Sequence, residues 1–65
     1  MLKVGIVGLG GISKVHISGW QNIDGAEIVA VCDIREEKFE GKEFARCYKS
    51  YDEMLEKETF DIIDV

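Results

Sequence analysis

The residues best suited to chemistry form one glycine-rich turn, Gly8-Leu9-Gly10-Gly11-Ile12-Ser13, which fits the pattern G-x-G-x-x-G with serine in the third place. Each position has a mechanical task in that pattern. Gly8 permits a tight turn, and Gly10 lets the backbone approach a pyrophosphate closely. The third position needs a small residue where helix meets strand, and Ser13 is small enough. The turn therefore predicts a phosphate-binding loop.

The residues around the turn support this interpretation. Leu2 to Val7 is a short apolar run that ends in glycine, which is typical of a strand buried on both faces. A helix beginning near Gly11 would direct free N–H groups at a phosphate, so Gly11 and Ile12 are predicted as main-chain donors. The helix is predicted from an apolar stripe, expected to face inward, that comprises Ile12, Val15, His16, Gly19, Trp20 and Ile23.

Asp33 is the second candidate binding residue. It follows an apolar strand, Ile28–Cys32, about twenty residues beyond Ser13, where a carboxylate accepts hydrogen bonds from ribose hydroxyls. Alternatively, Asp33 could cap the N-terminus of a following helix, because Glu36 lies three residues later. A carboxylate here repels a 2′-phosphate, which favours NAD over NADP. Arg35 could offset that repulsion by pairing with the phosphate or stacking on adenine, or it could be a solvated surface charge.

The later elements complete an alternating pattern. Glu36–Arg46 is predicted to be helical, Cys47–Lys49 a short edge strand, and Ser50–Glu53 the capping box of a further helix. Phe60–Val65 begins a fourth apolar strand. The alternation predicts an α/β fold, a partial Rossmann (βαβαβαβ-like) parallel three-layer sandwich in which the strand at Ile62 lies beside the strand at Val4. We expect residues 1–65 to be the N-terminal part of a dinucleotide-binding domain, truncated after the fourth strand.

Composition excludes several classes of function. The 65 residues include no proline and 46% of them are apolar, so disorder is not expected. The net charge of −5 argues against a nucleic-acid partner. No apolar run is long enough to span a membrane, and the N-terminus lacks the features of a signal peptide, so a cytoplasmic setting is expected. Cys32 and Cys47 are predicted to be small buried residues rather than zinc ligands or a disulfide. His16 and Trp20 are predicted to be structural, so no catalytic or metal-binding residue is expected.

With these residues placed, the chain resembles the N-terminus of the glucose–fructose oxidoreductase, inositol dehydrogenase and rhizopine-catabolism (Gfo/Idh/MocA) family. The resemblance spans the whole chain and rests on the segments Lys3–Ser13, Ala30–Asp33, Tyr48–Leu55 and Asp61–Val65. It implies a parent enzyme that binds NAD or NADP and oxidises or reduces a hydroxyl or carbonyl, commonly of a sugar or cyclitol. A C-terminal α/β domain would supply substrate contacts and oligomerisation.

Carried over by the resemblance, Gly8, Gly10 and Ser13 match the phosphate loop, and Asp33 matches the ribose contact. Ser13 departs mildly from the more usual alanine or glycine. The family's Cys-Thr-Pro-like segment, its Glu-Lys-Pro motif with the catalytic lysine, and its downstream histidine region have no match in these 65 residues. Because hydride transfer needs cofactor, substrate and proton donor held together, we expect this part alone to be catalytically incomplete.

Three other interpretations stay open. The chain could be a stand-alone nucleotide-binding or regulatory module without turnover, or a half-domain whose main property is self-association. A methyltransferase or flavoprotein start is a weaker possibility. Because an unpaired apolar strand edge invites pairing with another copy, we also expect a homodimer or higher oligomer.

Overall fold

Four parallel strands form one sheet in the computed structural model, which describes all residues from Met1 to Val65. The strands are β1 (Leu2–Val7), β2 (Ala26–Cys32), β3 (Arg46–Tyr48) and β4 (Ile62–Asp64). Their order across the sheet is β3-β2-β1-β4, so β4 pairs with β1 on the side away from β2. The α/β fold and the neighbouring positions of the first and last strands are confirmed.

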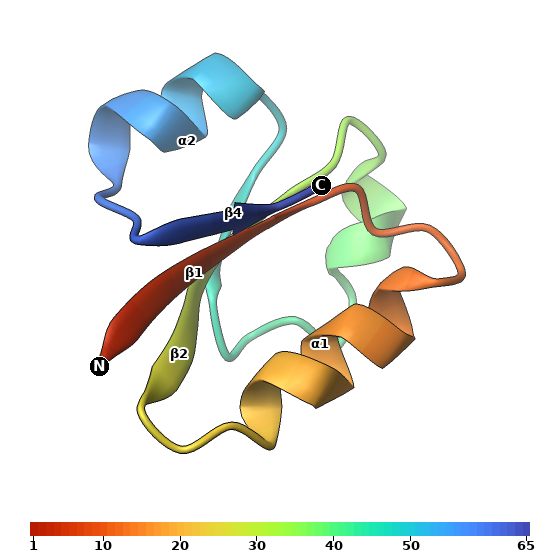
Figure 1. Cartoon of the computed structure of the whole chain (residues 1–65). Helices are drawn as coiled ribbons and strands as arrows, with labels where there is room; N and C mark the ends of the chain where they lie inside the picture. Colours follow the sequence, from red (N-terminus) through yellow and green to blue (C-terminus); the bar gives the residue numbers. More distant parts are fainter.

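Two α-helices cover opposite faces of the sheet and give three layers (Figure 1). Helix α1 (Ser13–Gln21) packs on one face and helix α2 (Tyr51–Lys57) on the other. Neither helix has the length and apolar character that crossing a bilayer would require.

Two apolar clusters hold these layers together, one on each face of the sheet. The sheet separates them, and a bulge in β2 changes which residues face each side. Val4 of β1 pairs with Ile28 while Gly5 pairs with Ala30, which leaves Val29 as an extra residue. Ile28 and Val31 therefore lie in the same cluster although they are three residues apart. The buried cluster on the α1 side consists of Val4, Ile6, Leu9, Ile17, Ala26, Ile28 and Val31. The cluster on the α2 side consists of Ala30, Cys32, Tyr48 and Met54. The sheet is therefore buried on both faces, as parallel sheets generally are.

Gly5 interrupts the β-branched run of β1 for a packing reason. A Cβ atom at Gly5 would lie 2.7 Å from Cε1 of Phe60, so the ring of Phe60 occupies the space that a side chain would take. Phe60 stands just before β4 and packs against the cluster on the α2 side. Glycine at this position therefore lets the segment before β4 lie directly against β1.

The predicted helix over Glu36–Arg46 is wrong. Only Glu36–Phe39 is helical, as a single 3₁₀ turn, η1, and the chain then continues through turns closed by Lys42 N–H to Phe39 O and Ala45 N–H to Lys42 O. Gly41 has φ +77°, a left-handed conformation that ends a helix. Phe39 and Ala45 pack against the apolar cluster on the α1 side, which this irregular path allows and a straight helix would not.

The inward face predicted for the first helix is also partly wrong. Ile12, Val15 and Ile23 are exposed, with 72%, 70% and 49% of their surface accessible. The face against the sheet consists of Ser13 and Ile17, both buried, together with the half-buried His16 and Trp20. Only His16 and Trp20 of the predicted stripe therefore face inward, because the small Ser13 and the apolar Ile17 make the closest contacts with the sheet.

Two smaller predictions have mixed outcomes. In the predicted capping box, Ser50 Oγ accepts a hydrogen bond from Glu53 N–H at 3.2 Å, whereas the Glu53 carboxylate lies 3.6 Å from Lys57 Nζ. Cys32 is buried as expected, but Cys47 is exposed because it lies on the edge strand β3. Both cysteines are free. The edge strand itself is confirmed.

Candidate functional site

The glycine loop leaves the carboxyl end of β1 through a conformation that only glycine adopts readily. Gly8 has φ +91°, in the left-handed region, and its N–H donates to Cys32 O at 2.8 Å. That hydrogen bond ties the start of the loop to the end of β2. The predicted role of Gly8 as the tight-turn residue therefore agrees with its backbone conformation.

The amides at the start of α1 face no acceptor within the chain. Ser13 N–H and Ser13 Oγ both donate to Gly10 O, at 2.9 and 2.6 Å, and close the turn that precedes the helix. No backbone hydrogen bond is donated by Gly10, Gly11 or Ile12 N–H, and no side chain caps α1. These unpaired donors at the positive end of a helix dipole form an arrangement suited to an anionic oxygen.

The glycines at 10 and 11 are not required by anything inside the chain. A Cβ atom at Gly10 or Gly11 would meet no heavy atom within 4 Å, and neither residue has a positive φ. Neither packing nor backbone strain therefore explains the absence of side chains at these two positions. Close approach of a molecule from outside does explain it, because side chains here would hold such a molecule away from the amides.

Asp33 lies against this loop rather than away from it. Its Oδ2 accepts a hydrogen bond from Leu9 N–H at 2.8 Å, and the residue is only 6% exposed. Arg35 donates to the same carboxylate from its backbone N–H, Nε and Nη2, at 2.8, 3.0 and 2.9 Å. These bonds, from Arg35 first and then from Leu9 N–H, hold the pKa of Asp33 well below its usual range. Asp33 is therefore a fixed anion beside the glycine loop.

This arrangement decides between the interpretations of the acid. The residue before the 3₁₀ turn η1 is Arg35, and no side chain caps that turn, so the helix-cap role predicted for Asp33 is wrong. Asp33 instead closes a local turn by accepting from Arg35 N–H. Arg35 is half-exposed but bound to Asp33 through two guanidinium nitrogens, so it is not a free surface charge.

Two open hollows flank the loop and bring in residues that sequence reasoning missed. A hollow of about 410 Å³ adjoins Gly8, Asp33 and Arg35, and is also lined by Lys49 and Tyr51. A second hollow of about 350 Å³ lies over Gly10 and Gly11 and is lined by three lysines, Lys14, Lys38 and Lys42, as well as by Glu37 and Glu40. Lys38 and Lys42 belong to the segment Glu36–Arg46 that the sequence predicts as a helix. No sequence signal marked these lysines, because the turns after Asp33 are what return them to the loop.

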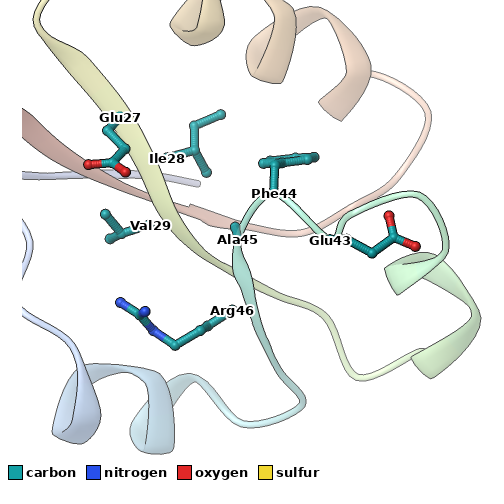
Figure 2. Close-up of a pocket in the computed structure, with 7 residues that line it drawn as sticks. All are labelled: Glu27, Ile28, Val29, Glu43, Phe44, Ala45 and Arg46. Atoms are coloured by element: carbon teal, nitrogen blue, oxygen red, sulfur yellow. The ribbon is translucent and has the colours of Figure 1, made fainter.

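A third hollow, of about 240 Å³, lies at the amino ends of β2 and β3, away from the glycine loop (Figure 2). Glu27 and Glu43 stand on opposite sides of it, with Phe44 between them. The guanidinium of Arg46 is engaged by Glu58, whose Oε1 lies 2.6 Å from Nη2. This hollow lies at no helix N-terminus, and the guanidinium beside it is already paired, so the candidate site is the loop end of the sheet.

His16 and Trp20 both contact β4. His16 Nδ1 lies 2.9 and 3.1 Å from the two carboxylate oxygens of Asp64, and Trp20 Nε1 donates to Asp64 Oδ2 at 2.9 Å. These hydrogen bonds, that of Trp20 first, lower the pKa of Asp64. The prediction that both residues are satisfied on the inner face of the helix therefore agrees with their contacts. No group of residues in the chain has the composition of a metal site.

Comparison with known proteins identifies the family. The model of the Gfo/Idh/MocA family, described as "Oxidoreductase family, NAD-binding Rossmann fold", matches residues 2–65. The chain belongs to this family. Family members with related sequences include D-apiose dehydrogenase of Paraburkholderia graminis, 39% identical over 67 residues, and glucose-6-phosphate 3-dehydrogenase of Bacillus subtilis, 36% identical over 59 residues. These alignments cover 97% and 86% of this chain, but 18% and 17% of the relatives.

Solved structures of two dehydrogenases have the same fold as this chain. The WlbA dehydrogenase from Bordetella pertussis, in complex with NADH and UDP-GlcNAcA, superposes with a TM-score of 0.86 at 36% identity. The scyllo-inositol dehydrogenase from Lactobacillus casei, with bound NAD(H) and scyllo-inositol, superposes with a TM-score of 0.82 at 25% identity. They match 95% and 97% of this chain, and 19% and 20% of their own chains. The chain thus spans about a fifth of the length of these relatives.

Proposed function

We propose that this chain is the cofactor-binding part of a dehydrogenase that transfers a hydride between NAD and a hydroxyl or carbonyl carbon of a sugar- or cyclitol-like molecule. Family membership supports the reaction class. The substrate class is inferred from relatives named for D-apiose, glucose 6-phosphate and scyllo-inositol. NAD is the first choice of cofactor because two of the solved relatives contain NADH or NAD(H).

One observation carries the proposal: unpaired main-chain donors and a fixed carboxylate converge on the same loop. Gly10, Gly11 and Ile12 offer free amides, while Asp33 is bound to Leu9 N–H within that loop. A dinucleotide needs both features, because its diphosphate is an anion and its ribose presents hydroxyl donors. Ser13 supports the geometry by closing the turn onto Gly10 O.

The residues would divide the binding work as follows. The amides of Gly10, Gly11 and Ile12 would hold the diphosphate, and Gly8 would set the turn. Asp33 would accept hydrogen bonds from the ribose hydroxyls, and Arg35 would lie over the adenosine end of the cofactor. NADP is the second choice of cofactor. When bound, the nicotinamide supplies the carbon that accepts or donates hydride. The share of the reaction that we assign to residues 1–65 is binding and orienting the cofactor, with no catalytic residue among them.

Calorimetric titration with NAD⁺ tests the proposal through two matched glycine variants. Neither Gly10→Ala nor Gly19→Ala places a Cβ atom within 4 Å of any heavy atom, so both should fold. Gly10→Ala should weaken NAD⁺ binding at least about tenfold, because the added methyl group stands over the phosphate-binding amides. Gly19→Ala, in the middle of α1, should leave binding unchanged. Equal affinities of both variants and the parent chain would contradict the proposed site.

We further propose that the chain self-associates as a homodimer or higher oligomer. The support is the free edge of β4, which pairs with β1 on one side and with nothing on the other. An open strand edge that carries Ile62 and Ile63 offers unpaired main-chain groups to a second copy. Sedimentation over rising protein concentration should show a growing average mass, and a constant monomer mass at high concentration would rule the idea out.

A further inference from the structure

The only histidine of the chain forms a carboxylate–imidazole pair at the edge of the candidate site. His16 lies in the second turn of α1, Asp64 is the last residue of β4, and the two are joined by contacts of 2.9 and 3.1 Å. The pair borders a small hollow of about 50 Å³ that is also lined by Gly8, Ile12 and Ser13. His16 and Asp64 therefore adjoin the glycine loop itself, although neither belongs to its sequence pattern.

The chemistry of the pair fixes the orientation of its proton. The lowered pKa of Asp64 keeps this carboxylate ionised, so it can only accept hydrogen bonds. His16 Nδ1 must then carry a proton, which leaves Nε2 as the atom that gains or loses one. Nε2 has no hydrogen-bond partner in the chain, and the His16 side chain is 40% exposed. The free end of the ring is therefore open to a ligand and to solvent.

The order of the strands places this pair opposite Asp33. Asp33 follows β2, whereas Asp64 ends β4, and β1 with its glycine loop lies between the two strands. A molecule held at its diphosphate by the loop amides, with its first ribose at Asp33, has its second half on the β4 side. The hollow beside His16 lies on that side of the loop.

We infer that His16 and Asp64 form a binding group for the second nucleotide of the cofactor, with His16 Nε2 donating to its phosphate–ribose end when the ring is protonated. This inference rests on the proposed function. Neutral His16 leaves the negative charge of Asp64 uncompensated near the phosphate of the second nucleotide, and protonated His16 compensates it. NAD⁺ binding then takes up a proton, so affinity increases as pH falls through the range in which histidines gain charge, about pH 8 to 5.

Few other charged groups lie near His16, so a pH dependence of NAD⁺ binding can be assigned to this residue. The charged groups nearby are Asp64 from β4 and Lys14 from α1, which lines the neighbouring hollow over the loop. β1 contributes only Ile6, Val7 and Gly8 to the hollow. His16 is the only imidazole among the residues that line this hollow or the neighbouring one. The test polypeptide is made with a C-terminal amide, so that no terminal carboxylate at Val65 adjoins the pair.

Proton NMR offers a direct test because the ring signals of a single histidine need no assignment. The pH titration of His16 is followed in the free chain, with saturating AMP, and with saturating NAD⁺. AMP is supplied as its phosphate methyl ester, which carries only the first nucleotide and has no second phosphate ionisation, and it should leave the His16 midpoint unchanged. NAD⁺ should raise that midpoint by roughly 0.5 to 1 pH unit, which corresponds to about three- to tenfold tighter binding at pH 5.5 than at pH 8.

Two variants separate a binding role from a structural one. His16→Asn keeps a donor toward Asp64 but cannot titrate, so its NAD⁺ dissociation constant should be the same at pH 5.5 and pH 8. Trp20→Phe removes a different donor to Asp64 and should retain the pH dependence. If NAD⁺ binds the parent chain but moves neither the His16 midpoint nor the dissociation constant with pH, the inference is overturned while the proposed function stands. If neither AMP nor NAD⁺ binds at any pH, both are overturned.

Discussion

Two arginine–carboxylate pairs occupy opposite ends of the same sheet, and they differ in what surrounds them. At the amino end, Glu58 accepts from Arg46 and from Tyr48 Oη at 2.5 Å, and its side chain is 5% exposed. At the carboxyl end, Asp33 is bound by Arg35 and just as buried, but it also reaches the glycine loop through Leu9 N–H.

The difference shows which feature marks a binding site. Both carboxylates are ionised and satisfied, so pairing with arginine does not distinguish them. The end that holds Asp33 also has three amides without acceptors and two glycines whose missing side chains nothing in the chain requires. The end that holds Glu58 has no helix N-terminus, and its ion pair links β3 to the end of α2. We therefore assign ligand binding to the first pair and stability to the second.

The largest expected effect is on cofactor binding when the Asp33 carboxylate is changed. Asp33→Asn should weaken NAD⁺ binding by about 2 kcal/mol, roughly 30-fold, because a charged acceptor for the ribose hydroxyls is lost. The matched change Glu58→Gln should leave the affinity unchanged, since Glu58 lies at the other end of the sheet. Calorimetry on both variants checks this, and similar losses in the two would remove the distinction between the ends.

A second contrast concerns two glycines of the same region, Gly5 and Gly10. Gly5→Ala should lower the free energy of unfolding by roughly 1–3 kcal/mol, because its Cβ would lie 2.7 Å from the Phe60 ring. Gly10→Ala should lower it by less than about 0.5 kcal/mol, because no atom lies within 4 Å of the added carbon. Urea unfolding of both variants measures the difference. Replacement of Phe60 by Leu should reduce the cost of Gly5→Ala, and an unchanged cost would refute the packing explanation.

Acid should remove the contribution that the Glu58–Arg46 ion pair makes to the stability of the fold. Arg46 first, and then Tyr48, lowers the pKa of Glu58 to about 2 against the opposing effect of burial. Because the folded-state pKa is depressed, this contribution to stability is present above about pH 4.5 and is lost as pH falls toward 2. Glu58→Gln should cost about 1 kcal/mol at pH 6 and much less at pH 2.5. Unfolding curves at the two pH values test this, and an equal cost at both would show that the ion pair does not stabilise the fold.

The smallest expected effect concerns the choice between NAD and NADP. The Arg35 guanidinium pairs with the Asp33 carboxylate, and Lys49 lines the hollow that both residues adjoin. Arg35→Ala should therefore weaken NADP⁺ binding about threefold more than NAD⁺ binding, because the carboxylate would face the 2′-phosphate uncovered. Competition between the two dinucleotides measures the ratio. An unchanged ratio would show that Arg35 does not influence the preference.

The sequence predicted the parts of the fold that depend on local patterns. Continuous apolar runs marked the strands, and the glycine spacing marked the turn at the end of β1. The position of Asp33 beside that turn followed from parallel strand order, because the carboxyl ends of neighbouring strands meet at one edge of the sheet. Ser50 was identified as a cap because its partner is only three residues away.

The features that the sequence did not predict depend on contacts between distant residues. The Asp64 carboxylate lies 48 residues from His16, so nothing local showed how the ring is satisfied. The outward position of Ile12 and Val15 was hidden because apolar spacing alone does not tell which face meets the sheet. The irregular path from Glu40 to Ala45 follows from the packing of Phe39 and Ala45 against the sheet and from Gly41, which outweighed an apparent helical pattern.

An amide-resolved NMR titration of the chain with NAD⁺ tests the loop as the cofactor site most directly. The largest shifts should fall on the N–H signals of Gly10, Gly11 and Ile12, with smaller ones at Leu9 and Arg35. Signals from Glu43 to Arg46, around the hollow at the opposite end of the strands, should stay in place. If saturating NAD⁺ leaves the three loop amides unmoved, or moves those of Glu43 to Arg46 instead, the assignment of the loop as the cofactor site is contradicted.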